Sequence, residues 1–336
     1  MGELRIAKPY VIFMGDVADP ASAKTGFGLR DWCPEDVIGQ IRTAPGAVDL
    51  GLREVTIEQA VEAGARSLVV GIAPDGGRLK ESWTATLAEA AAAGLDVVSG
   101  LHTRLEAYPS IAAAAETAGS RLVNVRHPER SFPVGTGRRR SGKRLLTVGT
   151  DCALGKKYTA LGIAAELRAR GVPATFRATG QTGIMIAGAG VPIDAMVADF
   201  IAGAAEALTP DAPADHWDVI EGQGSLFHPS YAAVTLGLVH GSQPDAMVLC
   251  HDPRRRSIDG LPDFALPSLT VAIRRYEEAA HLTNGAAKVA AVSLNTGGMS
   301  EDEAAAAIGV AARETGLPAT DPIRHGAAPL VGSLIA

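Results

Sequence analysis

A glycine-bounded loop that ends in Gly-Lys offers the clearest chemistry in this sequence. The apolar run 145–148 predicts a buried strand, residues 149–156 read Gly-Thr-Asp-Cys-Ala-Leu-Gly-Lys, and a helical pattern rich in Ala and Leu follows. The backbone N–H groups of such a loop, the helix dipole and a Lys ammonium converge on an anion. We therefore expect a phosphate-bearing cofactor to bind at Gly149, Thr150, Asp151, Cys152, Ala153, Leu154, Gly155, Lys156 and Lys157.

Two departures from the common Gly-x4-Gly-Lys-Ser/Thr pattern argue against hydrolysis of a nucleoside triphosphate at this loop. Five residues separate Gly149 from Gly155, one more than the pattern has, and Lys157 occupies the Ser/Thr position that would ligate Mg²⁺. An ammonium repels a metal ion, and Thr159 is displaced from the ligating position. We therefore expect phosphate to be held without a metal, with an ordinary Gly-rich turn as the alternative interpretation.

Two further residues are candidates for acid–base chemistry. The stretch 218–221 predicts a short strand that delivers an acid onto the turn 222–224. In P-loop folds this place holds a carboxylate that faces the phosphate site, so Glu221 is the first candidate for a general base or a ligand-orienting group. His228 lies in the polar loop that follows and is the second catalytic candidate, although a lone loop histidine is usually structural.

Length and composition indicate two α/β domains. The 336 residues are enough for two buried cores, and 47% hydrophobic with only 4% aromatic residues suits helices packed on parallel strands. Over residues 1–137, apolar strands alternate with helical patterns, which predicts a Rossmann-like N-terminal domain. It lacks Gly-x-Gly-x-x-Gly after its first strand, so a nicotinamide dinucleotide is not expected. Its ligand groups should come from the loops 71–77 and 124–128, which follow predicted strands.

The strand pattern breaks down between residues 128 and 142. We place a P-loop NTPase-like, doubly wound parallel-sheet domain at residues 138–336. The basic run 138–140 indicates a solvated linker, with contact to a phosphorylated ligand as the alternative. A second Arg triplet, 254–256, follows the apolar run 246–250. We expect Arg254 to bind a second phosphate of the cofactor, although a solvated loop explains it equally well.

Charge and segment patterns limit the partners. The formal net charge of −6 argues against nucleic acid and favours a small metabolite. No segment near the start has the pattern of a signal peptide, and no apolar run has membrane-spanning length, so we expect a cytoplasmic protein without a membrane partner. Cys33, Cys152 and Cys250 are widely spaced, which predicts reduced thiols rather than disulfides or a metal knuckle.

The phosphate loop, with Glu221 and the turn behind it, resembles the dethiobiotin synthetase-like branch of P-loop proteins. The chain as a whole resembles, more specifically, the family of D-glutamate N-acetyltransferases. That resemblance rests on a combination of motifs, none of which is specific alone: Gly71-Ile72-Ala73-Pro74, Asn124-Val125-Arg126-His127-Pro128, Thr179-Gly180-Gln181-Thr182-Gly183, Ser293-Leu294-Asn295-Thr296 and Asp321-Pro322-Ile323-Arg324.

The resemblance implies a Rossmann-like domain joined to a P-loop domain. It also implies transfer of acetyl from acetyl-CoA to the amine of a D-amino acid, D-glutamate above all, in D-amino acid catabolism. Coenzyme A carries a pyrophosphate and a 3′-phosphate that a P-loop can hold without cleaving them, so acetyl-CoA as co-substrate suits a loop without an Mg²⁺ ligand. The expected partners are the amino acid and acetyl-CoA, with no metal, and we expect a homo-oligomer.

Acetyl transfer needs a base for the ammonium nucleophile and donors for the developing oxyanion. Glu221 is the first choice for the base and His228 the second. Cys152, as carrier of a covalent acetyl-thioester, is a minor alternative. The expected substrate-binding groups, which comprise amide and hydroxyl donors and carboxylate-binding arginines, are Gln181, Thr182, Gln223, Arg126, Arg177 and Arg324.

Two other classes of function remain open. One is an ATP- and Mg²⁺-dependent ligase or kinase of the dethiobiotin synthetase type, against which the missing metal-ligating hydroxyl counts. The other is a nucleotide- or CoA-binding protein without catalysis, in which Glu221 and the polar loops would only contact the ligand.

Overall fold

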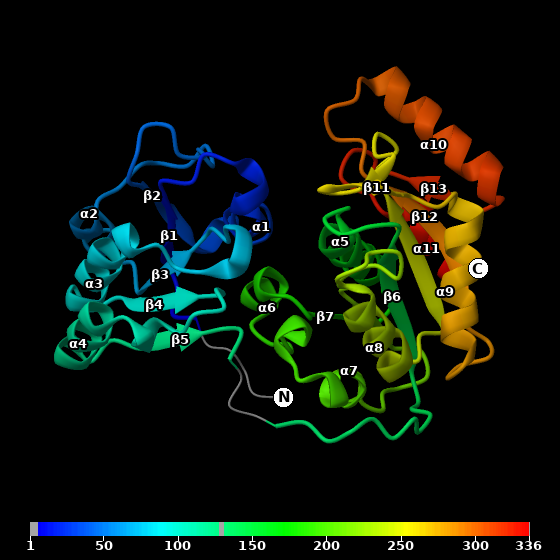
Figure 1. Cartoon of the computed structure of the whole chain (residues 1–336), viewed down its shortest axis with the longest axis horizontal. Helices are drawn as coiled ribbons and strands as arrows, with labels where there is room; N and C mark the ends of the chain where they lie inside the picture. The colour runs from blue at the N-terminus through cyan, green and yellow to red at the C-terminus, as the bar shows by residue number, and fades with distance from the viewer. Residues whose placement is uncertain (1–5, 128–130, 336) are drawn as a thin grey trace. The chain divides into compact units, whose positions relative to one another are not determined.

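The computed structural model describes residues 6–127 and 131–335, and the chain forms two compact units (Figure 1). Unit 1 comprises Met1–Arg130 and Gln181–Ala195, and unit 2 comprises Ser131–Gly180 and Met196–Ala336. The first division falls at residue 130, before the expected boundary at 137. The segment 181–195 belongs to unit 1, although its place in the sequence assigned it to the C-terminal domain.

Unit 1 is built on a five-stranded parallel sheet with the order β2-β1-β3-β4-β5. Four of its strands form at apolar runs of the sequence, and the parallel α/β architecture expected of a Rossmann-like domain is confirmed. The strands are β1 (Tyr10–Gly15), β2 (Val37–Arg42), β3 (Ser67–Val70), β4 (Asp96–Ser99) and β5 (Leu122–Asn124).

Strand β2 is the strand of this sheet that the apolar pattern does not reveal, because Gly39 and Gln40 interrupt its hydrophobic residues. Gln40 is fully buried, and its amide nitrogen donates to Asp49 at 2.7 Å and to Glu54 at 2.8 Å. A Cβ on Gly39 would lie 2.5 Å from the carbonyl oxygen of Arg53. The chain after β2 therefore folds back against the strand, and buried hydrogen bonds replace apolar packing there.

Helix α6 belongs to unit 1 although unit 2 strands precede and follow it in the chain. Its Thr182 hydroxyl lies 2.9 Å from the hydroxyl of Thr25 on α1. Gly100 packs so closely on α6 that a Cβ there would lie 1.8 Å from the Gln181 side-chain oxygen. The helices of unit 1 are α1 (Lys24–Trp32), α2 (Ile57–Glu62), α3 (Thr84–Ala92), α4 (Pro109–Ala118) and α6 (Gln181–Ala187).

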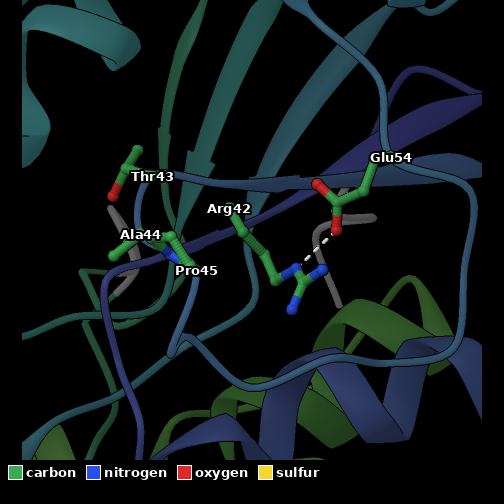
Figure 2. Close-up of a pocket in the computed structure, with 5 residues that line it drawn as sticks. All are labelled: Arg42, Thr43, Ala44, Pro45 and Glu54. Atoms are coloured by element: carbon green, nitrogen blue, oxygen red, sulfur yellow. Dashed lines mark hydrogen bonds and ion pairs between the residues drawn. The ribbon is translucent and has the colours of Figure 1, made fainter.

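A hollow of about 310 Å³ opens at the carboxyl end of β2 (Figure 2). Its lining residues are Arg42, Thr43, Ala44, Pro45 and Glu54. The guanidinium of Arg42 is bound to the carboxylate of Glu54 and lies 3.6 Å from Asp49. The one cation that lines the hollow is thus already paired with acids.

Unit 2 is built on a six-stranded sheet with the order β13-β12-β9-β6-β8-β7, and each neighbouring pair is parallel. Its strands are β6 (Lys143–Gly149), β7 (Ala174–Arg177), β8 (Trp217–Ile220), β9 (Ala246–His251), β12 (Lys288–Leu294) and β13 (Ala319–Thr320). A separate antiparallel hairpin joins β10 (Ser257–Ile258) to β11 (Leu261–Ala265). The parallel sheet agrees with the predicted P-loop domain.

Small and branched side chains of two helices, α5 and α11, pack on the inner strands of this sheet in one buried core. Its members include Leu145, Ala160, Ile163, Leu167, Val219, Val248, Leu330 and Val331. The helices of unit 2 are α5 (Lys156–Ala169), α7 (Ile201–Leu208), α8 (Ala232–Ser242), α9 (Leu269–His281), α10 (Glu301–Thr315) and α11 (Ala328–Ile335). Within the described ranges, no helix of either unit is long and apolar enough to cross a membrane.

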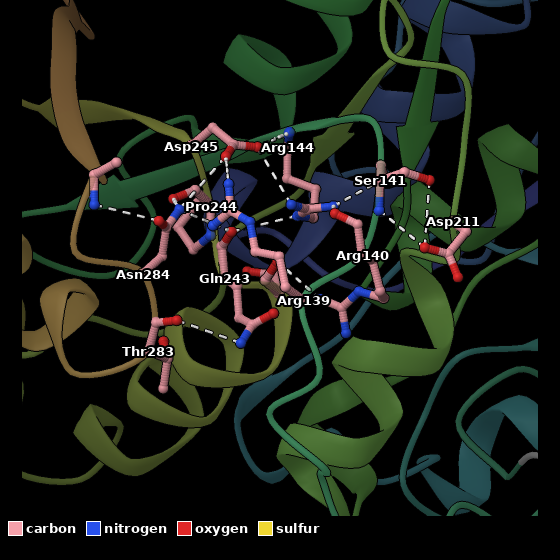
Figure 3. Close-up of polar contacts among 12 residues, drawn as sticks. Arg139, Arg140, Ser141, Arg144, Asp211, Gln243, Pro244, Asp245, Thr283 and Asn284 are labelled. Carbon is pink, nitrogen blue, oxygen red and sulfur yellow. Dashed lines mark hydrogen bonds and ion pairs between the residues drawn. The ribbon is translucent and has the colours of Figure 1, made fainter.

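The basic run 138–140 precedes β6 and is bound within unit 2, and Figure 3 shows Arg139 and Arg140. Arg138 pairs with Asp211 and Arg139 with Asp245, both at 2.7 Å. Arg140 is buried, and its Nη2 donates to the carbonyl oxygens of Gly241 and Ser242, at the end of α8. The solvated-linker interpretation is therefore wrong for Arg140, which satisfies carbonyl groups that a helix end leaves unpaired.

Each strand order contains one topological switch point, where successive connections leave in opposite directions along the sheet. In unit 1 it lies between β1 and β3, and in unit 2 it lies between β6 and β9. Ligands of open parallel sheets bind at the carboxyl ends of the strands that flank such a point. The fold therefore directs attention to four loops, which follow β1, β3, β6 and β9.

Candidate functional site

The loop after β6 has the strand–loop–helix geometry that the sequence predicts. Strand β6 ends at Gly149 and α5 begins at Lys156. Gly155, the N-cap residue, has φ 94°, and Ala153 has φ 54°, so both adopt the left-handed conformation that a Cβ disfavours. These turns curl the loop ahead of the helix N-terminus, where backbone N–H groups and the helix dipole favour an anion.

Lys156 supplies a buried positive charge to this loop. Its side chain folds back so that the ammonium donates to the carbonyl oxygen of Asp151 at 2.8 Å. Only 6% of the residue is exposed, and burial lowers the pKa of the amine. One carbonyl leaves two of the three ammonium N–H groups for an anion. Binding of a phosphate would therefore give a desolvated cation its counter-charge.

Lys157 and Thr159 of α5 offer no free hydroxyl oxygen to a metal at the loop. Lys157 stands at the Ser/Thr position of the common pattern, and its ammonium nitrogen lies 5.0 Å from the centroid of the Tyr158 ring. The buried hydroxyl of Thr159 lies 2.8 Å from the Ser293 hydroxyl and receives a contact from the Cys250 thiol at 3.6 Å. An ATP- and Mg²⁺-dependent ligase needs a hydroxyl ligand for the metal at this position. Here an ammonium occupies the position, and the hydroxyl of Thr159 is hydrogen-bonded within the protein.

Asp151 joins the two loops at the switch point of unit 2. Its fully buried carboxylate accepts N–H groups of Cys152 at 2.6 Å and Asp259 at 2.9 Å, and it pairs with Arg255 at 2.7 Å. Sequence reasoning chose Arg254 from this triplet, whereas the structure places Arg255 against the phosphate loop. Arg254 binds Asp252 instead. The backbone N–H of Arg254 donates to the Asp252 carboxylate in a tight turn, which brings the guanidinium of Arg254 to the same carboxylate.

Glu221 directly follows β8 (Trp217–Ile220), which pairs with β6. Its Oε2 accepts the backbone N–H groups of Thr179 and Gly180, both at 2.9 Å. Its Oε1 has no hydrogen bond with another described residue. Burial raises the pKa of the carboxyl. The two N–H donors and the nearby ammonium groups of Lys157 and Lys156 lower it, but by less. The site therefore holds an oriented carboxylate with one oxygen left to accept a proton.

His228 lies beside the phosphate loop. Ligand atoms of His228, Cys152 and Asp151 fall within 4.8 Å of one another, which makes them a candidate metal centre among the described residues. The Asp151 oxygens already accept N–H donors, and the Nδ1 of His228 accepts the N–H of Ser230 at 3.1 Å. That bond places the proton of a neutral imidazole on Nε2, so His228 suits hydrogen-bond donation better than proton abstraction.

The three arginines expected to bind a substrate carboxylate are all paired within the protein. Arg126 is bound to Asp194 and donates to the carbonyl oxygen of Gly100. Arg177 donates to the buried Asp218 at 2.7 Å, and Arg324 pairs with Glu301 at 2.7 Å. A substrate would have to displace an existing partner from each of them, at a cost in binding energy.

The expected amide and hydroxyl donors fall in different units. Gln223 of unit 2 donates to the Thr179 hydroxyl at 3.2 Å, which places it beside Glu221 and its backbone donors. Gln181 and Thr182 begin α6 and pack in unit 1. Of the loop 124–128, Pro128 lies outside the described residues. The structure thus brings Glu221, Gln223, His228 and the phosphate loop together in unit 2.

Together the fold and the site define a class of protein. One unit is a Rossmann-like parallel α/β domain, and the other is a P-loop domain whose loop lacks the hydroxyl ligand for a metal. Two family models match this arrangement in the same order: "Domain of unknown function (DUF1611_N) Rossmann-like domain" over residues 43–128 and "Domain of unknown function (DUF1611_C) P-loop domain" over residues 133–331.

The chain belongs to the DUF1611 family. A solved structure of a DUF1611 family protein from Anabaena variabilis is similar, with 34% identity and a TM-score of 0.90 over 98% of this chain and 99% of that one. Two curated relatives are each named "D-glutamate N-acetyltransferase". The relative from Tritonibacter scottomollicae is 50% identical over 98% of this chain and 99% of its own length, and the one from Pseudoalteromonas is 42% identical over 98% and 100%. These relatives identify the chain as an acyltransferase, so the non-catalytic alternative does not hold.

Proposed function

We propose that this protein transfers the acetyl group of acetyl-CoA to the amine of D-glutamate. The substrate and the reaction follow from the two relatives named D-glutamate N-acetyltransferase, which match over nearly the whole length of both chains. We place the reaction in the catabolism of D-amino acids. The acetyl thioester supplies the activated acyl group, and the residues of this chain bind and orient the two substrates and deprotonate the amine.

The observation that carries the cofactor assignment is the buried ammonium of Lys156 in a loop without a metal-ligating hydroxyl. Its two remaining N–H donors and the N-terminus of α5 suit a phosphate that is held rather than cleaved. Coenzyme A has this chemistry, because its pyrophosphate stays intact during acetyl transfer. The phosphate loop, residues 149–157, is therefore assigned to the phosphates of acetyl-CoA.

Glu221 is assigned as the general base. An ammonium must lose a proton before it can attack a thioester, and the Oε1 of Glu221 is an oriented acceptor whose pKa burial raises. Because the pantetheine arm separates the thioester from the pyrophosphate, this assignment requires the arm to turn back toward the end of β8. The Nε2–H of His228 and the amide of Gln223 are the nearby donors suited to a developing oxyanion.

The direct test is release of free thiol from acetyl-CoA by the purified protein with D-glutamate, without ATP or Mg²⁺. The expected result is thiol release that requires D-glutamate, with N-acetyl-D-glutamate identified by mass. L-glutamate and D-glutamine serve as comparison substrates. Strict dependence on ATP and Mg²⁺ would replace this proposal with a ligase or kinase reaction.

A further inference from the structure

The proposed acceptor carries two carboxylates, and each of them needs hydrogen-bond donors in the protein. The three arginines that sequence reasoning chose are held by Asp194, Asp218 and Glu301. A specific site for an acidic amino acid needs cations that are not already neutralised, since a buried or paired carboxylate competes for the same N–H groups. The following inference rests on the proposed function and concerns the acceptor site.

Two exposed arginines stand at the carboxyl edge of the unit 1 sheet. Arg78 lies on the loop after β3, and Arg104 lies on the loop after β4. Neither guanidinium makes a hydrogen bond or an ion pair with another described residue. Strand β3 flanks the switch point of unit 1, where open parallel sheets bind their ligands, and β4 is its neighbour.

Local structure fixes the backbone that carries Arg78. Gly76 and Gly77 have φ 77° and 58°, so two successive left-handed residues turn the chain sharply just before the arginine. A Cβ on Gly77 would lie 2.4 Å from the ring of His102, and the backbone N–H of His102 donates to the Gly77 carbonyl oxygen at 2.7 Å. This contact joins the loop after β3 to the loop after β4.

The second loop is held in the same way on both sides of Arg104. His102 binds Gly77, and Leu105 donates its backbone N–H to the Asn124 side chain at 2.8 Å. The Tyr108 hydroxyl then donates to the carbonyl oxygen of Leu79 at 3.0 Å. The two arginines therefore project from adjacent loops whose backbones are tied together, which limits the entropy lost when both bind one ligand.

The acid on the loop after β1 is already bound to other groups of unit 1. Asp16, the acid that follows β1, accepts from Lys80 at 2.9 Å and from the Trp83 indole at 2.8 Å, so its charge is already balanced. The hollow at the end of β2 is a poorer site, because Glu54 occupies the guanidinium of Arg42 (Figure 2). Two unpaired cations on tied loops match the two carboxylates of a glutamate-like ligand.

We propose that Arg78 and Arg104 bind the carboxylates of the acidic amino acid acceptor at the carboxyl edge of unit 1 and determine its specificity. Each pairing is a charge-assisted hydrogen bond of the fork-to-carboxylate type. Acceptors with one carboxylate, such as D-glutamine, lose one of the two pairings. The site selects acidic amino acids for this reason.

The test compares Arg78→Ala and Arg104→Ala with Arg66→Ala. Arg66 is also an exposed arginine without a side-chain partner among the described residues, and it lies at the opposite, amino end of strand β3. Binding of D-glutamate alone is measured by calorimetry, and kcat/KM is measured for D-glutamate and D-glutamine with acetyl-CoA. We expect each edge variant to bind D-glutamate about ten- to a hundredfold more weakly and one of them to lose the preference over D-glutamine, while Arg66→Ala matches the wild type.

The binding measurement separates this inference from the proposed reaction. One outcome is that the wild type binds D-glutamate, both edge variants lose that binding, and no protein transfers acetyl. This outcome supports the acceptor site and contradicts the proposed reaction. Unchanged binding and selectivity in both Arg78→Ala and Arg104→Ala overturns the inference, as does a wild-type protein that binds no D-glutamate. Equal weakening in Arg66→Ala also overturns it, because a general charge effect would then explain the result.

Discussion

The carboxylate of Asp151 and the guanidinium of Arg255 lie 2.7 Å apart and join the loop after β6 to the loop after β9. Asp151 is fully buried, and Arg255 also donates to the carbonyl oxygen of Cys152 at 3.0 Å. Because these loops flank the switch point of unit 2, one ion pair fixes the backbone on both sides of the expected phosphate site. A P-loop that holds an intact cofactor gains from such rigidity, since the anion then meets donors already in place.

Replacement of Arg255 by Ala should destabilise the protein, because it leaves a buried carboxylate with only its N–H donors. We expect the free energy of unfolding to fall by about 2–4 kcal/mol. Arg254→Ala is the matched control, since its ion pair with Asp252 has a guanidinium side chain that is 46% exposed, and its loss should cost less than about 1 kcal/mol. Urea unfolding of the three proteins measures both values. Equal losses would show that the Asp151 pair has no special role.

Lys156→Ala should weaken acetyl-CoA binding about ten- to a hundredfold, the size expected when a charged donor to a phosphate is removed. Lys143→Ala is the control. It removes the same charge from the same strand–loop segment, but at the exposed amino end of β6. Titration calorimetry with acetyl-CoA and with CoA gives both affinities. If Lys156→Ala binds acetyl-CoA as tightly as Lys143→Ala does, the phosphates do not occupy the loop.

Turnover with acetyl-CoA should be indifferent to EDTA and to added Mg²⁺. Lys157 places an ammonium where the common pattern has a metal-ligating hydroxyl, and the Thr159 hydroxyl is bound to Ser293. Thiol release measured with EDTA, with Mg²⁺ and with ATP–Mg²⁺ should agree within error. A large activation by the metal alone would mean that another group near the loop ligates it, with Asp151 and His228 the first to examine.

The sequence was sufficient to predict the elements around the phosphate loop but not the partners of their side chains. Apolar runs, glycines and helical periodicity located β6, the phosphate loop, α5 and Glu221, because each signal is local. Arg177 looked available as a substrate ligand because its partner could not be identified from the sequence. The register that sets Arg177 diagonal to Asp218 across β7 and β8 becomes known only with the strand order. Such pairings depend on tertiary structure.

Two other differences have the same origin. Arg254 and Arg255 are adjacent in one basic run, and only the turn at Asp252 decides which of them reaches Asp151. Helix α6 follows β7 in sequence yet packs on α1 in unit 1. Proximity in the chain therefore placed Gln181 and Thr182 in the C-terminal domain, whereas they pack in unit 1, and nothing in their local pattern signals the crossing. Their substrate-binding role stays a prediction.

Glu221 should make stability depend on pH in a predictable direction. Burial raises its pKa in the folded protein above the ordinary value of 4.5, so folding favours the protonated form. Its contribution to stability is full below the unfolded-state pKa and is lost as pH rises through the folded-state pKa. Glu221→Gln should remove this loss, so the variant should gain melting temperature relative to wild type as pH increases over that window. A parallel pH dependence in the two proteins would show that the carboxyl does not titrate there.

The kinetic counterpart uses the same variant. As general base, Glu221 must be ionised, so kcat should rise with pH through its raised pKa, opposite to its effect on stability. Glu221→Gln keeps the shape and an oxygen for the N–H groups of Thr179 and Gly180 but cannot take a proton. We expect kcat to fall by a factor on the order of a hundred or more, with the acetyl-CoA affinity nearly unchanged.

Glu206→Gln is the matched control, because that carboxylate of α7 also accepts backbone N–H groups, from Thr136 and Gly137. It lines a second hollow, in unit 2, together with Arg138 and Arg140. Its kcat should stay near the wild-type value. A different result for Glu221→Gln, in which acetyl-CoA affinity changes and kcat does not, would place Glu221 against the bound phosphates. The pantetheine arm would then extend away from β8 instead of turning back, and the base would have to be sought at the far end of that arm.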